Sequence, residues 1–70
     1  MTLKQITIKK PHAQYQELQL LSKLLQSEQI KSNGKVTVKT DLECDILDIR
    51  KRVKELMNVK YSDITCVYLN

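Results

Sequence analysis

Apolar and polar residues alternate along two short segments in the first half of the chain. In residues 3–10, Ile6 and Ile8 fall on one face of an extended chain, and polar residues fall on the other. Residues 35–40 show the same alternation, with their two valines on the inward face. A period of two residues is typical of a half-buried strand, so both segments are predicted to be strands.

Residues 11–30 are predicted to form a helix, because Pro11 suits a first helical position and good helix formers follow it. Its apolar residues form two stripes roughly 120–140° apart, since successive helical residues differ by about 100°. A helix that covers one side of a sheet needs a single stripe. We therefore expect the second stripe to contact a partner protein or a second copy of the chain, the alternative being deep burial within one chain. The first stripe is Tyr15, Leu18, Leu21 and Leu25, and the second is Ala13, Leu20 and Leu24.

A turn at residues 32–34 separates this helix from the second predicted strand, with Gly34 available for a positive φ. Thr40 and Glu43 then fit a capping box, although Asp41 is an alternative cap. A second helix is predicted from residue 41 to about residue 59, with its apolar residues within roughly 100° of arc. This stripe consists of Leu42, Ile46, Ile49, Val53, Leu56 and Met57.

Residues 64–69 are predicted to form a third strand, and both of its faces are largely apolar. Such a strand is typical of the centre of a sheet that is covered on both sides. The expected fold is therefore a small α/β domain over residues 1–70, with β-α-β-α-β order and the third strand central. If the strands are parallel, right-handed crossovers place the two helices on opposite faces. Two alternatives remain open, namely both helices on one face with a partner subunit on the other, and an antiparallel first strand.

A chain of 70 residues buries only a modest core, so oligomerisation, most simply a homodimer, is expected to supplement it. Two unclustered cysteines, no secretory signal and no transmembrane segment predict a cytoplasmic protein.

No constellation of catalytic, cofactor-binding or metal-ligating residues is recognisable in the sequence, so we expect neither an enzyme nor a small-molecule ligand. His12 is the only histidine, and acidic neighbours oppose thiolate formation at Cys44. The acidic residues Asp41, Asp45 and Asp48 share a helical spacing, which is equally typical of a solvated helix start.

The net charge of +4 arises in the first 40 residues, which carry seven lysines and two glutamates. The last 30 residues carry five basic and six acidic side chains. A basic surplus of this kind can track a phosphate backbone, whereas three tyrosines are too few for a base-stacking surface. The candidate nucleic-acid contacts are Lys9, Lys10, Lys39, Arg50 and Arg52.

Residues 36–69 resemble the central half of a ubiquitin-like β-grasp domain, with a strand, a capped helix and a last strand. Residues 3–40 resemble the β-α-β opening of ribosome-binding initiation factors and KH-type domains, without the Gly-x-x-Gly loop of the KH site. Neither resemblance transfers a functional residue. In size and lysine content, the chain also resembles short proteins of bacteriophages and mobile elements. The sequence favours a non-enzymatic regulatory protein that binds another protein, and the alternative is a nucleic-acid-binding regulator.

Overall fold

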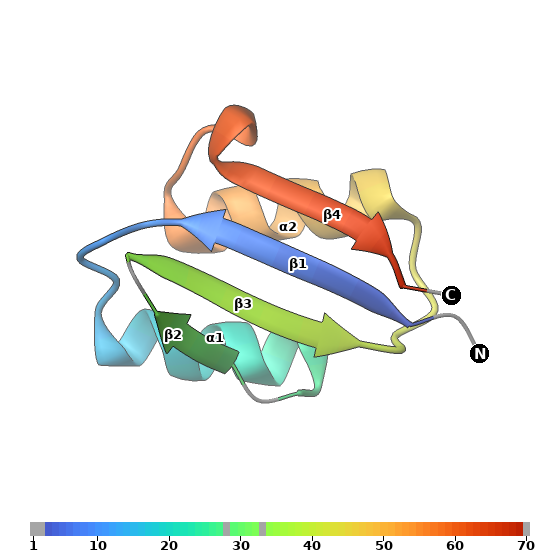
Figure 1. Ribbon diagram of the computed structural model, residues 1–70, viewed down its shortest axis with the longest axis horizontal. Helices are drawn as coiled ribbons and strands as arrows, with labels where there is room; N and C mark the ends of the chain where they lie inside the picture. Colours follow the sequence, from blue (N-terminus) through green and yellow to red (C-terminus); the bar gives the residue numbers. More distant parts are fainter. Residues whose placement is uncertain (1–2, 28, 33, 70) are drawn as a thin grey trace.

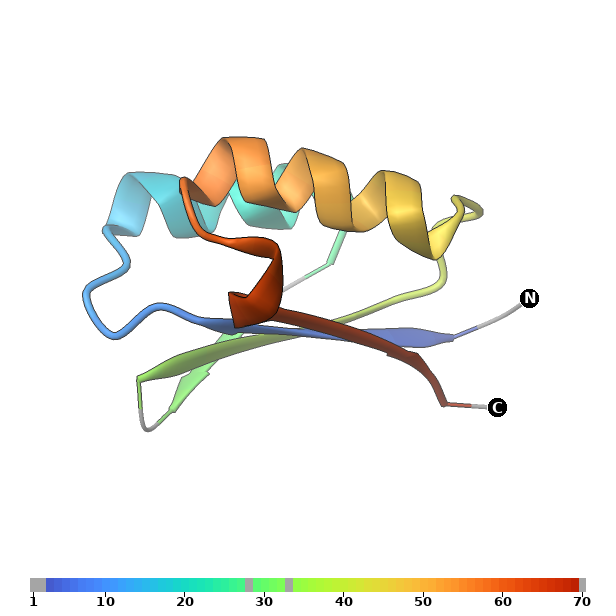
Figure 2. The same cartoon turned by 90° about the horizontal axis from the view of Figure 1, so that it is seen from above.

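A four-stranded antiparallel sheet carries two helices on one of its faces (Figures 1 and 2). The structure is a computed structural model that describes residues 3–27, 29–32 and 34–69. None of the helices in these ranges is both long enough and apolar enough to cross a membrane. In chain order, the elements are β1 (Lys4–Lys9), α1 (Tyr15–Leu25), β2 (Gln29–Ser32), β3 (Lys35–Thr40), α2 (Ile46–Met57), the 3₁₀ helix η1 (Tyr61–Asp63) and β4 (Ile64–Tyr68).

The strands lie in the order β2-β3-β1-β4, and every neighbouring pair is antiparallel. With the β-α-β-β-α-β element order, this is the connectivity of the ferredoxin-like, or split β-α-β, arrangement. The expected small α/β fold with two helices is therefore present. The expected strand order is wrong, because β1 and β3 are central and β4 lies at an edge.

The two helices lie side by side over the same face, rather than on opposite faces as parallel strands would require (Figure 2). The β2–β3 hairpin is the reason, because it inserts β3 antiparallel between β1 and β2. The other face of the sheet is covered by no described element. Val67 of β4 and the adjacent Leu69 are exposed on that face. The prediction of a central strand was wrong because it assumed that both apolar faces of this strand are covered within one chain.

The first helix is shorter than predicted, and its expected last residues form β2 instead. Gln26 takes a left-handed conformation with φ 54°, and the Ser27 N–H donates to the Ser22 carbonyl, which ends α1. Ser32 then pairs with Lys35, and Asn33 of the predicted turn lies outside the described residues. The predicted turn is confirmed at Gly34, which has φ +73°.

The second helix begins at Ile46, not near residue 41, and Thr40 does not cap it. Thr40 is buried at the end of β3, where its hydroxyl donates to the Leu25 carbonyl and accepts from the Leu42 N–H. These bonds tie the end of α1 to the segment that leads into α2.

The core lies between the helices and the inward faces of the strands, and it is aliphatic. The predicted inward residues of both strands are buried, and so are most residues of the main stripe of each helix. The exceptions are Tyr15, which is 71% exposed, and Leu42, Ile46 and Leu56, which are only partly buried. The most buried side chains are Ile6, Ile8, Leu21, Leu25, Val36, Val38, Ile49, Val53 and Met57.

Candidate interaction surfaces

A shallow apolar groove runs between α1 and α2 on the side that faces away from the sheet. Leu20 and Leu24 reach it from α1 and Leu56 from α2, and Leu20 is 50% exposed. Its remaining lining residues are charged, namely Lys23, Arg52 and Glu55. Residues four apart lie on one helix face, so the spacing of Leu20 and Leu24 places both side chains along the groove.

Ala13, the third member of the predicted stripe, does not reach this groove. It precedes α1 and is buried in the core, with 8% exposure. The pattern assumed a helix that began at Pro11, whereas α1 begins at Tyr15, so Ala13 does not follow the helical periodicity.

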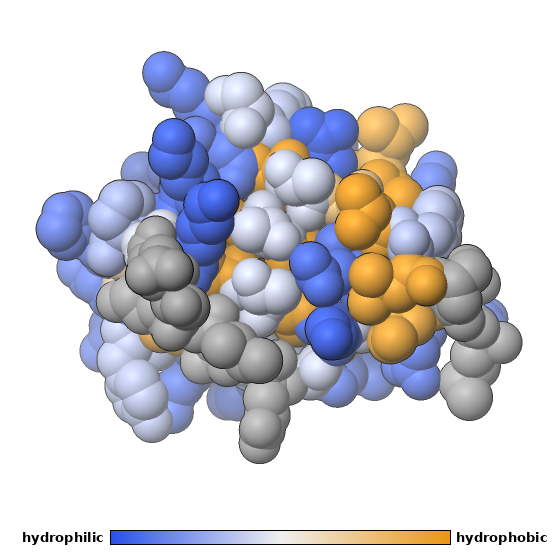
Figure 3. Space-filling model, viewed as in Figure 1, coloured by the Kyte–Doolittle hydropathy of each residue, from blue (hydrophilic) through white to orange (hydrophobic). Residues whose placement is uncertain are grey.

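The centre of the sheet face opposite the helices carries residues of intermediate hydropathy (Figure 3). Thr7 lies between Thr37 on β3 and Thr65 on β4. At one end of this face Lys9 pairs directly with Lys35, and both side chains are exposed. Lys39 is exposed near the other end, opposite Gln5. The described residues of β1 and β3 place three lysines and no carboxylate on this face.

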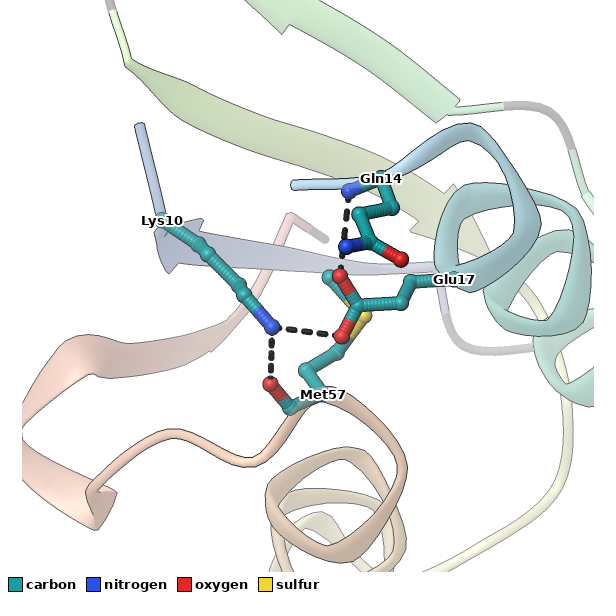
Figure 4. A network of polar contacts seen from close by, with 4 residues as sticks. All are labelled: Lys10, Gln14, Glu17 and Met57. Carbon is teal, nitrogen blue, oxygen red and sulfur yellow. Dashed lines mark hydrogen bonds and ion pairs between the residues drawn. The ribbon is translucent and has the colours of Figure 1, made fainter. Parts of the chain in front are cut away.

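Lys10 does not join these lysines, because its ammonium group points into a contact between three elements (Figure 4). Its Nζ lies 2.5 Å from the Glu17 carboxylate and also donates to the Met57 carbonyl at the end of α2. Glu17 accepts a further bond of 3.0 Å from the Gln14 N–H. The hydrogen bond from Lys10 and that from Gln14 lower the pKa of Glu17, because both stabilise its charged form.

Arg50 is also engaged within the fold. It donates to the Tyr61 carbonyl at 3.1 Å, and its guanidinium lies 5.6 Å from the centre of the Tyr61 ring. The Lys54 ammonium lies 5.2 Å from the same ring. These contacts fasten η1 to α2. The five predicted nucleic-acid contacts therefore divide among separate places: Lys9 and Lys39 on the open sheet face, Arg52 in the helix groove, and Lys10 and Arg50 in internal contacts.

No three His, Cys, Asp or Glu side chains among the described residues are placed to hold a metal ion. His12 and the carboxylates of Asp41, Asp45 and Asp48 are exposed. Cys44 and Cys66 are free thiols that pack partly against the core, and burial raises the pKa of Cys66.

Several exposed apolar side chains were not singled out from the sequence. Leu47 on α2 is 69% exposed, while Leu3, Val67 and Leu69 form an apolar region beside the chain termini (Figure 3). The sequence does indicate the exposure at Val67 and Leu69, because these residues form the apolar second face of the last strand, and no described element covers that face. Lys4, one of the seven lysines among the first 40 residues, is not a surface residue, because it is 3% exposed and donates to the Leu42 carbonyl at 2.6 Å.

Comparison of the chain with protein-family models, with curated proteins and with solved structures found no match.

Proposed function

We propose that this protein is a non-enzymatic regulatory module that binds an amphipathic helix of a partner protein in the groove between α1 and α2. The observation that carries the proposal is the apolar floor of the groove, which is formed by the half-exposed Leu20 and the partly buried Leu24 and Leu56. An apolar strip between two helices is the usual receptor for a third helix, whose residues at i, i+3 and i+4 enter it.

The charges around the groove indicate the character of the partner. Lys23 and Arg52 line it, and neither forms an ion pair with another described side chain. Glu55 is the one acidic lining residue. A helix with an apolar face and acidic residues beside that face would complement these two cations.

A comparison of three forms of the protein tests this proposal. The wild-type chain, Leu20→Glu and Leu47→Glu are immobilised and exposed to an extract of the cells that make the protein, and captured proteins are identified by mass spectrometry. Leu47 is the matched control, because it is an exposed leucine outside the groove, in a hollow with Arg50, Lys51 and Tyr61.

The proposal requires a protein that wild type and Leu47→Glu capture and that Leu20→Glu loses, with circular dichroism unchanged in all three. A peptide that covers the acidic amphipathic helix of this captured protein must then bind the wild-type chain. The same peptide must bind Leu20→Glu at least tenfold more weakly. Equal capture by the three forms would overturn the proposal.

A second candidate function is binding of a nucleic-acid backbone on the open sheet face. The observation that favours it is the direct pairing of Lys9 with Lys35, since like charges opposite each other destabilise a sheet. An anionic ligand would relieve that repulsion. The three threonines across the sheet centre can donate hydrogen bonds to phosphate oxygens but provide no ring for base stacking.

A gel shift at several salt concentrations tests this second candidate. Each lost phosphate contact reduces the slope of log affinity against log salt by about 0.7 to 0.9. Lys9→Gln with Lys35→Gln should therefore flatten the slope by about 1.5, whereas Lys60→Gln, at an exposed position outside the sheet, should leave it unchanged. Absence of any shift at low salt would remove this candidate.

A further inference from the structure

The outer edge of β4 is an unpaired strand edge without a charged residue. Strand edges in soluble proteins are usually protected from pairing by lysine, proline, a bulge or a covering element. Residues 64–69 contain no charged residue, no proline and no glycine, and no described element lies along their outer side (Figure 1). The opposite edge, β2, includes Lys31.

The register with β1 determines which backbone groups of β4 point outward. The Leu69 N–H donates to the Leu3 carbonyl at 2.9 Å, and hydrogen-bonded pairs alternate along an antiparallel ladder. Thr65 and Val67 therefore bond to β1, whereas the N–H and C=O groups of residues 64, 66 and 68 point away from it. The Ile64 N–H donates to the Tyr61 carbonyl within η1.

Cys66 and Tyr68 thus present four outward backbone groups that have no partner within the described part of the chain. Beside them, Val67 and Leu69 expose apolar side chains on the open face of the sheet, next to Leu3. The edge combines unpaired hydrogen-bonding groups with an apolar flank, and such a surface requires a cover.

We infer that a second copy of the chain pairs antiparallel with this edge, about a two-fold axis at Val67, to form a continuous eight-stranded sheet. In this register Cys66 of each copy faces Tyr68 of the other, and all four outward groups form hydrogen bonds. A register centred on Cys66 would instead require the Ile64 N–H to donate to the other copy, but this N–H already donates to the Tyr61 carbonyl.

Two further observations favour a second copy over another partner. The edge is self-complementary about Val67, as an isologous dimer interface must be. In addition, the chain has a net charge of +4, so two copies repel unless they meet through an uncharged surface, and β4 supplies one. This dimer is independent of the groove between the helices.

The register predicts one specific cross-link. Opposed residues of a non-hydrogen-bonded pair have Cα atoms about 4.5 Å apart, which lies within the range of a disulfide. Val67→Cys should therefore form a disulfide-linked dimer under mild oxidation, in a background with Cys44→Ser and Cys66→Ala. Thr65→Cys is the matched control, because Thr65 would lie about 13 Å from its own copy.

Light scattering across a concentration series completes the test. The wild-type mass should rise from 8.2 kDa towards twice that value. Val67→Lys should remain at 8.2 kDa at every concentration with an unchanged circular dichroism spectrum, because it opposes two ammonium groups at the axis. Leu20→Glu should dimerise as wild type does. A wild-type protein that stays monomeric at millimolar concentration, or equal cross-linking of the Val67→Cys and Thr65→Cys forms, would overturn the inference.

Discussion

Lys10 connects three elements that are distant in the sequence. It follows β1, its ammonium binds Glu17 in the first turn of α1, and it donates to Met57 at the end of α2 (Figure 4). Removal of the lysine would take away the donor to the Met57 carbonyl and the donor to one oxygen of the Glu17 carboxylate, whose other oxygen still accepts from the Gln14 N–H.

Replacement of Lys10 by Met should therefore lower the free energy of unfolding by about 1–2 kcal/mol. Lys9→Met is the control, since Lys9 is exposed on the open face, and it should change stability by less than about 0.5 kcal/mol. Urea denaturation of both variants measures the difference. Equal effects would show that Lys10 behaves as an ordinary surface lysine.

The same contact makes part of the stability dependent on pH. The pKa of Glu17 is lowered in the folded chain from its usual value of 4.5, because Lys10 and the Gln14 N–H bind the charged carboxylate. A depressed folded pKa adds stability above the unfolded pKa, and that stability disappears as pH falls through the folded pKa. The difference in unfolding free energy between wild type and Glu17→Gln should therefore shrink between pH 6 and pH 3. A difference that is constant over this range would contradict the assignment.

Gly34 has a backbone conformation that is strained for residues with a side chain. Its φ of +73° lies in the left-handed region, and the Gly34 carbonyl accepts a 3.1 Å bond from the Lys10 N–H. A Cβ at this position would meet Pro11 at 3.5 Å, which is ordinary contact, so only backbone strain opposes substitution. Gly34→Ala should cost about 1–2 kcal/mol in thermal or urea unfolding, and Gly34→Asn less.

At the scale of elements, the sequence predicted best where one period dominated. The stripe through Ile49, Val53 and Met57 left only one orientation for α2, and these residues are buried as predicted. The end of α1 was missed because Gln26 adopts a left-handed conformation without the glycine that usually marks one. β2 was missed because its first two residues continue a run of helix formers, and only the pairing of β2 with β3 makes it a strand.

The position of β4 could not be predicted from its own residues. An apolar second face fits a central strand and equally fits an edge strand whose cover is another molecule. The structure separates these alternatives, because Ile64 faces the core with 3% exposure while Val67 is 43% exposed on the opposite face.

Two substitutions to threonine in this strand check that assignment. Ile64→Thr should lower the free energy of unfolding by about 2 kcal/mol or more, since it places a hydroxyl in the core. Val67→Thr should change it by less than about 0.5 kcal/mol when measured at a concentration that keeps the chain monomeric. Similar losses at both positions would instead mean that β4 is covered on both faces.

At the scale of the molecule, the fold distributes the candidate contacts over three separate surfaces. The helix groove faces away from the sheet, the lysines lie on the open face, and the β4 edge lies between these two sides. The faces on which Leu20, Leu24, Lys9 and Lys39 lie could be predicted, because each residue follows the period of its own element. The engagement of Lys10 and Arg50 could not, since their acceptors come from elements that are distant in the sequence.

The opposed lysines on the open face connect stability with function. Lys9 and Lys35 form a non-hydrogen-bonded pair, in which side chains lie closest, and their repulsion adds to that of a chain with a net charge of +4. Lys35→Glu replaces this repulsion with attraction and should stabilise the chain by about 0.2–1 kcal/mol at low salt.

Because salt screens exposed charges, the stabilisation by Lys35→Glu should largely vanish near 1 M sodium chloride, while Lys60→Glu, outside the sheet, should show no comparable gain. If the lysine pair serves an anionic ligand, the same substitution should also abolish nucleic-acid binding, so that stability and function change in opposite directions. A Lys35→Glu variant that is more stable and still binds nucleic acid would assign the lysine pair no part in binding.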